Sequence, residues 1–137
     1  MRSPKPPTAV RRQRTIGVVA RSYLESALAG TVPSFATEWD AHRRAYSPTS
    51  PPGDADFLAA FRAHVVSLLG AGRVAETSRF FYALERLLGE ADPILRDLLD
   101  RDVIRALAVE CRLAGIDSRR VEPYLGQLTR GVWMSSA

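Results

Sequence analysis

Apolar residues recur along this chain at steps of three and four positions, which is the spacing of one face of an α-helix. Residues 16–29 (IGVVARSYLESALA) show it first, and Gly30 follows them as a helix stop. The apolar face of this segment consists of Val19, Tyr23, Leu24 and Leu28. No segment alternates apolar and polar residues over a long β-branched run, as a half-buried strand would. The pattern therefore predicts an all-α fold.

The same spacing, together with helix start and stop residues, predicts further helices along the rest of the chain. They lie near residues 35–46, 57–69, 74–88, 93–113, 118–124 and 127–134. The clearest start is Asp92 before Pro93, because the aspartate can accept free amide hydrogens of the first turn and the proline has none there. Gly115 ends the longest helix. Residues 47–53 (SPTSPPG) cannot continue a helix and form the one clear internal linker.

Short loops, of about three to five residues, separate the helices predicted to begin near residues 56, 74 and 93. Connections of this length place consecutive helices antiparallel. We therefore expect a single domain of five to seven helices over residues 16–137, built from antiparallel helical hairpins. A bundle and a short HEAT-like stack both fit this pattern, and no sequence repeat at a fixed period supports a longer array.

The positive charge of the chain is concentrated at its N-terminus. Residues 1–14 contain five basic residues and no acid, whereas the remainder has 14 basic and 15 acidic residues. The composition of residues 1–15 is typical of a disordered basic arm. Such an arm can also attract phosphates or an acidic partner, and Arg11, Arg12 and Arg14 are its candidate phosphate contacts.

No apolar run in the sequence has the length of a membrane span. Arg, Asp or Glu interrupts every run before it reaches the roughly 18 to 20 residues that a transmembrane helix needs. No apolar segment of signal-peptide length follows the basic N-terminus. We therefore expect a cytoplasmic protein that does not enter a membrane.

The residue types that carry catalysis or hold metals are sparse. His42 and His64 do not form a local ligand pair, and Cys111 is the single cysteine, so the sequence has no zinc motif. Cys111 lies among apolar residues of a predicted helix, which favours a buried structural thiol. Whether His64 is buried stays open. No glycine-rich phosphate loop or nucleophilic serine motif occurs, so we expect no enzyme activity, no cofactor and no metal.

An acidic run, DLLDRD, contains Asp97, Asp100 and Asp102, with arginines close by. The pairs expected on a helix are Asp97 with Arg101 and Asp100 with Arg96, and Arg105 can reach Asp102 or the neighbours of Arg101. This arrangement predicts solvated ion pairs and not a metal or acid–base cluster. Asp102 also has apolar neighbours in helical projection. If it faces inward, it needs an arginine of a neighbouring helix or a backbone amide as its partner.

Two stretches in the second half of the chain resemble a known family. They are RFFYALERLLGEADPILRDLLDRDVI and, after the long helix, VEPYLGQLTRGVW. The block from Phe57 to Trp133 that contains them resembles a family of small bacterial helical domains of unknown function. The resemblance implies a short stack of helical hairpins and a role as an immunity protein or an adaptor. It implies no catalytic residues.

The stretch VEPYLGQLTRGVW is either a ligand-binding motif or the closing element of the domain. Pro123 ends or restarts a helix, Gly126 permits a turn that a side chain would hinder, and a last short helix follows. We expect a structural closure. The apolar side that docks on the preceding hairpins is expected to consist of Tyr124, Leu125, Leu128, Val132 and Trp133.

Four aromatic residues could either fill the core or anchor an interface, namely Trp39, Tyr46, Tyr82 and Trp133. With no convergent polar constellation in the sequence, we expect a non-enzymatic protein-interaction domain of a bacterial cytoplasmic protein. An immunity protein or an adaptor that binds a partner protein is its expected form. The alternative is a small nucleic-acid-binding regulator that uses the basic arm.

Overall fold

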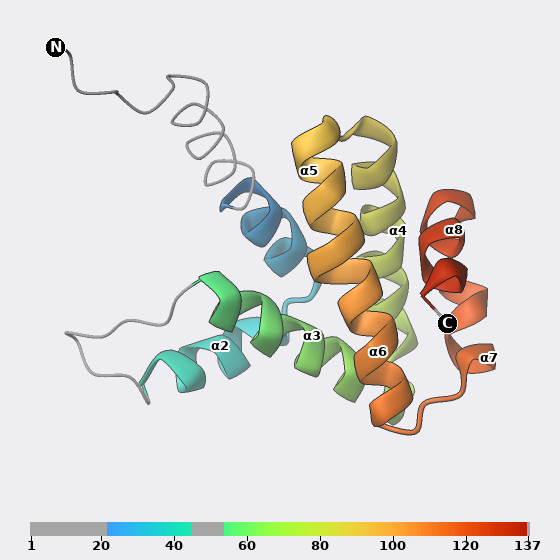
Figure 1. Ribbon diagram of the computed structural model, residues 1–137. Coiled ribbons are helices and arrows are strands. Elements are labelled where there is room, and N and C mark those ends of the chain that lie inside the picture. Colours follow the sequence, from blue (N-terminus) through green and yellow to red (C-terminus); the bar gives the residue numbers. More distant parts are fainter. Residues whose placement is uncertain (1–21, 45–53, 137) are drawn as a thin grey trace, which may run out of the picture.

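The computed structural model describes residues 22–44 and 54–136, and nearly all of them are helical (Figure 1). In chain order the elements are the helix of residues 22–31, α2 (Phe35–Arg44), α3 (Asp54–Ala71), α4 (Val74–Glu90), α5 (Pro93–Leu98), a π-helical segment (Leu99–Arg105), α6 (Ala106–Leu113), α7 (Ser118–Val121), a 3₁₀ turn (Glu122–Tyr124) and α8 (Gln127–Ser135). These residues contain no strand, so the predicted all-α fold is confirmed.

The helix α4 occupies the centre of the arrangement. It lies antiparallel to the continuous helix formed by α5, the π-helical segment and α6, and α8 packs along it on another side (Figure 1). The helix α3 crosses α4 and α6, and α2 packs against α3. Through α8 on one side and through Ser34, which bonds to Glu76, on the other, α4 contacts both ends of the described chain.

Aromatic rings form much of the core and connect these helices. Phe35 of α2 packs edge-on against Phe61 of α3 at 5.0 Å between ring centroids. Phe61 contacts Phe80 of α4 at 5.6 Å, and Phe80 contacts its neighbour Phe81 at 4.9 Å. All four rings are fully buried. Trp133 of α8 then packs edge-on against Phe81 at 6.3 Å, so a chain of aromatic contacts runs from α2 to α8.

Local signals in the sequence set several helix ends. The amide of Leu95 donates to Oδ1 of Asp92 at 2.8 Å, and Pro93 occupies the first turn, as the Asp92–Pro93 pair predicts. The chain leaves α3 at Gly72 and α6 near Gly115, whose positive φ values of 69° and 75° are ones that a residue with a side chain rarely adopts. The long helix predicted for residues 93–113 is confirmed, with the π-helical segment in its middle.

Some expectations lie outside the described residues. They concern the basic arm of residues 1–15, the linker of residues 47–53 and the domain boundaries, which stay predictions. Between residues 22 and 136, wherever the structure describes the chain, none of the helices has both the length and the hydropathy that a bilayer span demands.

Candidate functional site

A groove with a volume of about 760 Å³ lies between the end of the first described helix, α4 and the turn before α8. One wall contains Gly30 and Thr31. The α4 wall consists of Ser78, Arg79, Phe81, Tyr82, Ala83 and Glu85. The third wall is Pro123, Tyr124, Leu125 and Gly126, which belong to the stretch VEPYLGQLTRGVW. Three segments that are distant in sequence therefore form this groove.

The apolar part of the groove is aromatic. Tyr82 is 68% exposed, although its ring is large and mostly apolar. Tyr124 is half-buried and stacks on the buried Phe81, with 5.9 Å between the centroids and 18° between the ring planes. The groove thus combines a fixed aromatic floor with an exposed aromatic ring beside it.

The carboxylate of Glu85 is engaged with the start of α8. Its two oxygens accept hydrogen bonds from the amides of Leu128 and Thr129, both at 2.9 Å, and from the hydroxyl of Thr129 at 3.0 Å. Burial alone raises the pKa of Glu85, but these three donors outweigh it, and the pKa lies below its ordinary value. Glu85 is therefore an ionised carboxylate that caps α8 from another helix.

Gly126 is required at this point for space and not for backbone conformation. Its φ of −74° is accessible to any residue. A Cβ atom there would lie 2.6 Å from Cγ of Glu85 and still closer to the carboxylate. The expectation that a side chain at position 126 would be a hindrance thus has a specific cause, which is the close approach of Glu85.

The helix α8 closes the domain largely as expected, with one correction. Leu125 and Trp133 are buried, and Trp133 is only 6% exposed. Leu128, which was expected on the docked side, is 48% exposed. Thr129 takes the buried position instead, because its hydroxyl and amide both bond to Glu85.

A second polar cluster joins three segments through Ser34, His64 and Glu76. The hydroxyl of Ser34 lies 2.6 Å from Oε2 of Glu76 and 2.7 Å from Nε2 of His64, and the amide of Ser34 donates to the same glutamate oxygen at 3.1 Å. The Ser34 hydroxyl lowers the pKa of Glu76 most. Burial opposes this effect, whereas the Ser34 amide, Arg73 and His64 add to it, so the pKa falls below its ordinary value.

The direction of these hydrogen bonds limits the chemistry of the cluster. An ionised Glu76 only accepts, so the Ser34 hydroxyl donates its proton to Glu76 and accepts the Nε2 hydrogen of His64. A catalytic triad runs the other way, because there the serine donates to the histidine. The cluster is therefore arranged to connect segments, and His64, whose burial the sequence left open, is half-buried beside the ring of Phe35.

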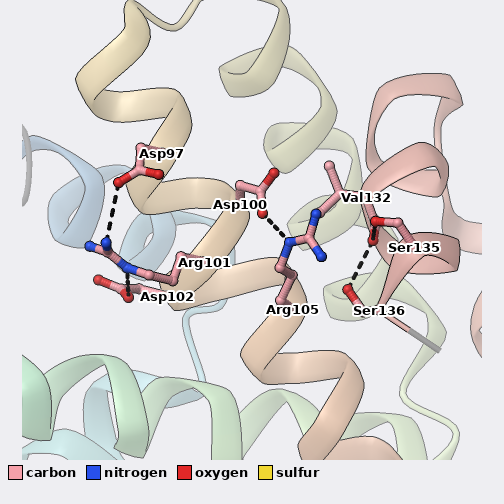
Figure 2. A network of polar contacts seen from close by, with 8 residues as sticks. All are labelled: Asp97, Asp100, Arg101, Asp102, Arg105, Val132, Ser135 and Ser136. Carbon is pink, nitrogen blue, oxygen red and sulfur yellow. Dashed lines mark hydrogen bonds and ion pairs between the residues drawn. The ribbon is translucent and has the colours of Figure 1, made fainter.

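The aspartate run forms ion pairs along the long helix (Figure 2). Asp97 pairs with Arg101 at 3.3 Å, as expected, and Arg101 also reaches Asp102 at 3.0 Å. Arg105 pairs with Asp100, a neighbour of Arg101, because a π-helical turn brings positions five apart together. The expected pairing of Arg96 with Asp100 is wrong. Arg96 instead donates to the carbonyl of Leu88.

Asp102 is neither fully buried nor fully exposed, since 23% of its side chain is accessible. Its carboxylate pairs with Arg101 of the same helix, whereas Arg62 of the neighbouring helix α3 reaches the backbone of Asp102. Arg62 donates to the carbonyl oxygen of Asp102 and to Glu110, both at 2.8 Å. In the described part of the chain, no three His, Cys, Asp or Glu side chains lie close enough together to hold a metal ion.

The single cysteine is a buried thiol. Cys111 lies in the core on α6, and burial, with a smaller contribution from Glu110, raises its pKa to about 11. It is therefore protonated at neutral pH and a poor nucleophile.

The four candidate interface aromatics occupy different environments. Trp133 lies in the core, and Trp39 is half-buried, with its ring 4.9 Å from that of Phe57. Tyr82 is exposed in the groove. Tyr46 and the candidate phosphate contacts Arg11, Arg12 and Arg14 lie outside the described residues.

The sequence reasoning missed both glutamate clusters. The available signal was their position on α4, because Glu76 lies four residues before the buried Phe80 and Glu85 lies four residues after the buried Phe81. An acidic residue on an apolar helix face needs a partner. The identity of that partner could not be read from the sequence, because it lies more than forty positions away in each case.

Residues 26–137 match the family described as a domain of unknown function, DUF7674, and the chain belongs to this family. The suspected membership of an all-helical family of unknown function is thereby confirmed. The matched range contains the groove and both glutamate clusters. No curated protein and no solved structure matches the chain.

Proposed function

We propose that this DUF7674 chain is a non-enzymatic protein-interaction domain that binds a segment of a partner protein in the groove beside Tyr82. The observation that carries the proposal is the exposure of the Tyr82 ring within a concave surface. Tyrosine is enriched among the residues that dominate protein interfaces, because it offers a large apolar ring and a polar tip at a low entropic cost.

The shape and chemistry of the groove support a peptide-like ligand. Its volume lies in the range of about 300 to 1,000 Å³ typical of ligand sites. Its walls are mostly apolar, and the stack of Phe81 and Tyr124 holds the aromatic floor in place. A floor that is already ordered reduces the entropy lost on binding.

The engagement of the polar groups supports a role in binding over a role in catalysis. Glu85 lines the groove, but its carboxylate oxygens are occupied by donors of α8. A general base needs an accessible lone pair near its substrate. In the other cluster, Ser34 donates to Glu76, so His64 does not activate it as a nucleophile.

An immunity protein or an adaptor is the form of this function that we favour. Both act by covering a surface of a partner and need no reactive group of their own. A stable helical scaffold with an aromatic groove suits this task. The partner would present the bound segment on its surface.

A library of short random peptides, displayed on phage and selected against the full chain, tests the proposal. We expect Tyr82→Ala to weaken the selected peptides about tenfold, since an interface tyrosine commonly contributes more than 1 kcal/mol. Tyr23→Ala is the matched control, because Tyr23 is 56% exposed but does not line the groove. Failure to select any peptide, or equal binding by both variants, would refute the proposal.

The charge of the arm supports a second candidate function, nucleic-acid binding through Arg11, Arg12 and Arg14. The supporting observation is five basic residues without an acid in residues 1–14. Binding to generic duplex DNA should fall steeply with salt, and removal of residues 1–14 should abolish that dependence. A salt dependence that survives the removal would assign the binding to another surface.

A further inference from the structure

We infer that the groove takes an acidic segment of the partner, with a carboxylate paired to Arg79 and an apolar side chain set against Tyr82 and Tyr124. This inference rests on the proposed binding function and specifies the chemistry of its ligand. It follows from the charges in the groove, from the spacing of Arg79 and Tyr82 on α4, and from the fixed position of Glu85.

Arg79 and Glu85 are the charged residues that line the groove. The negative charge of Glu85 is directed at the first turn of α8, where two amides and a hydroxyl donate to it. The positive end of the α8 dipole offsets this charge further. Three donors thus engage the Glu85 carboxylate and α8 offsets its charge, so Glu85 attracts a basic segment only weakly into the groove.

Arg79 differs from Glu85 because its charge is not matched by a partner. In the portion of the chain that the structure describes, no carboxylate pairs with it, and its Nε atom makes only a long hydrogen bond of 3.4 Å to the carbonyl of Ala75. An exposed guanidinium presents a planar set of donors that matches a carboxylate with two parallel hydrogen bonds. The groove thus has a cation without a carboxylate partner, whereas its one anion is largely engaged by α8.

The spacing on α4 defines where the ligand groups should lie. Arg79 and Tyr82 are three residues apart, so they lie on the same helix face with about 5 to 6 Å between their Cβ atoms. In an extended peptide, side chains two residues apart project to the same side at about 7 Å. We therefore expect a carboxylate two residues from an aromatic or aliphatic side chain in the bound segment.

A single unpaired arginine favours a peptide over a nucleic acid. Nucleic-acid affinity comes largely from several phosphates neutralised together. Among the groove residues, only Arg79 could contact a phosphate, whereas one carboxylate is sufficient for a peptide. The test must therefore distinguish an acidic peptide from a nucleic acid bound at Tyr82 and Arg79.

Arg86 provides a matched control for Arg79. Both are exposed arginines of α4, but Arg86 does not line the groove and pairs with Glu90 at 3.6 Å. Arg79→Glu and Arg86→Glu change the net charge equally. Any difference between the two variants therefore reports the position of the charge and not its total.

The test selects short random displayed peptides on the full wild-type chain, on Arg79→Glu and on Arg86→Glu. We expect peptides that combine Asp or Glu with an apolar residue two positions away on the wild-type chain and on Arg86→Glu. Arg79→Glu should bind those peptides about tenfold more weakly and should instead select Lys or Arg. Melting curves of the three proteins verify that each is folded.

The outcomes separate the inference from the proposed function. If Tyr82→Ala abolishes peptide binding but Arg79→Glu changes neither affinity nor the selected charge, the acidic ligand is wrong and the groove still binds peptides. If Tyr82→Ala has no effect, the proposed function fails as well. If a labelled single-stranded oligonucleotide binds more tightly than the selected peptides, and Arg79→Glu removes that binding, the ligand is a nucleic acid and the inference is overturned.

Discussion

Two glutamates of α4, Glu76 and Glu85, each hold the start of another helix, but they do so with different partners. Glu76 accepts the amide and the hydroxyl of Ser34, the residue before α2. Glu85 accepts the amides of Leu128 and Thr129 in the first turn of α8 and the hydroxyl of Thr129. The first amides of a helix have no partner within it, so a carboxylate supplied by a neighbouring helix satisfies them.

The two glutamates should differ in how much stability the protein loses when each carboxylate is removed. Both of these donors to Glu76 belong to Ser34, a half-buried residue whose hydroxyl also contacts His64. At Glu85, the donors come from two residues, and Thr129 is completely buried. A buried donor that loses its acceptor cannot turn to water. We therefore expect two carboxylates with similar local geometry to contribute differently to the free energy of unfolding, depending on which other acceptors their donors can reach.

The largest effect should follow from Glu85→Ala. Removal of the carboxylate leaves the amide and hydroxyl of Thr129 without an acceptor, at a cost of about 3 kcal/mol in the free energy of unfolding. Glu76→Ala should cost about 1 to 2 kcal/mol, because His64 still contacts the Ser34 hydroxyl. Urea denaturation measures both values.

Glu90→Ala is the matched control for these two substitutions. Glu90 also lies on α4, but it is exposed and pairs only with Arg86 at 3.6 Å, so its loss should cost less than about 0.5 kcal/mol. Equal destabilisation by Glu76→Ala and Glu85→Ala would show that burial of Thr129 does not distinguish the two clusters.

Gly126→Ala should destabilise the protein by about 1 to 2 kcal/mol through its contact with Glu85. The added Cβ would overlap the glutamate side chain and displace it from α8. In a Glu85→Ala background the same substitution should cost almost nothing, because the obstructing atoms are gone. A double-mutant cycle by urea denaturation measures this coupling, and strict additivity of the two changes would contradict it.

The fold could be predicted well where short-range signals decide it. Asp92 before Pro93 starts a helix because the aspartate accepts the Leu95 amide, and Gly115 ends one because it adopts a positive φ. Both effects operate within a few residues, so the sequence shows them directly. The apolar spacing likewise placed the buried Leu24 and Leu28 on the inner face of the first helix, although Tyr23, expected on the same face, is 56% exposed.

The candidate site could not be predicted in the same way, because its geometry is tertiary. Tyr82 was expected to fill the core or to anchor an interface, but the groove that it lines is completed by Tyr124 and Thr31, which lie far away in the sequence. The π-helical segment also carries no clear sequence signal. It brings Arg105 to Asp100, five positions earlier, where regular α-helical spacing would favour Asp102.

Low pH should weaken both glutamate clusters. A pKa below the ordinary value of 4.5 means that the folded state binds the proton more weakly than the unfolded state. The stabilisation is therefore complete above the unfolded pKa and is lost as the pH falls through the folded pKa. Urea midpoints should drop between about pH 6 and pH 3, and the drop should be smaller in the Glu76→Gln, Glu85→Gln double variant. An equal drop in both proteins would assign the acid sensitivity to other carboxylates.

Among the substitutions in the two glutamate clusters, Ser34→Ala should have the smallest effect. It tests how much the link from His64 through the Ser34 hydroxyl to Glu76 contributes to stability. The substitution removes the hydroxyl that joins His64 to Glu76 but keeps the Ser34 amide, which still donates to Glu76. We expect a loss of about 1 kcal/mol in the free energy of unfolding, below that of Glu76→Ala. Ser67→Ala, at an exposed serine of the same neighbourhood on α3, should be neutral and is the control. If Ser34→Ala costs as much as Glu76→Ala, the hydrogen bond from the Ser34 amide to Glu76 contributes nothing to stability. Glu76 would then stabilise the start of α2 only through the Ser34 hydroxyl, unlike Glu85 at the start of α8.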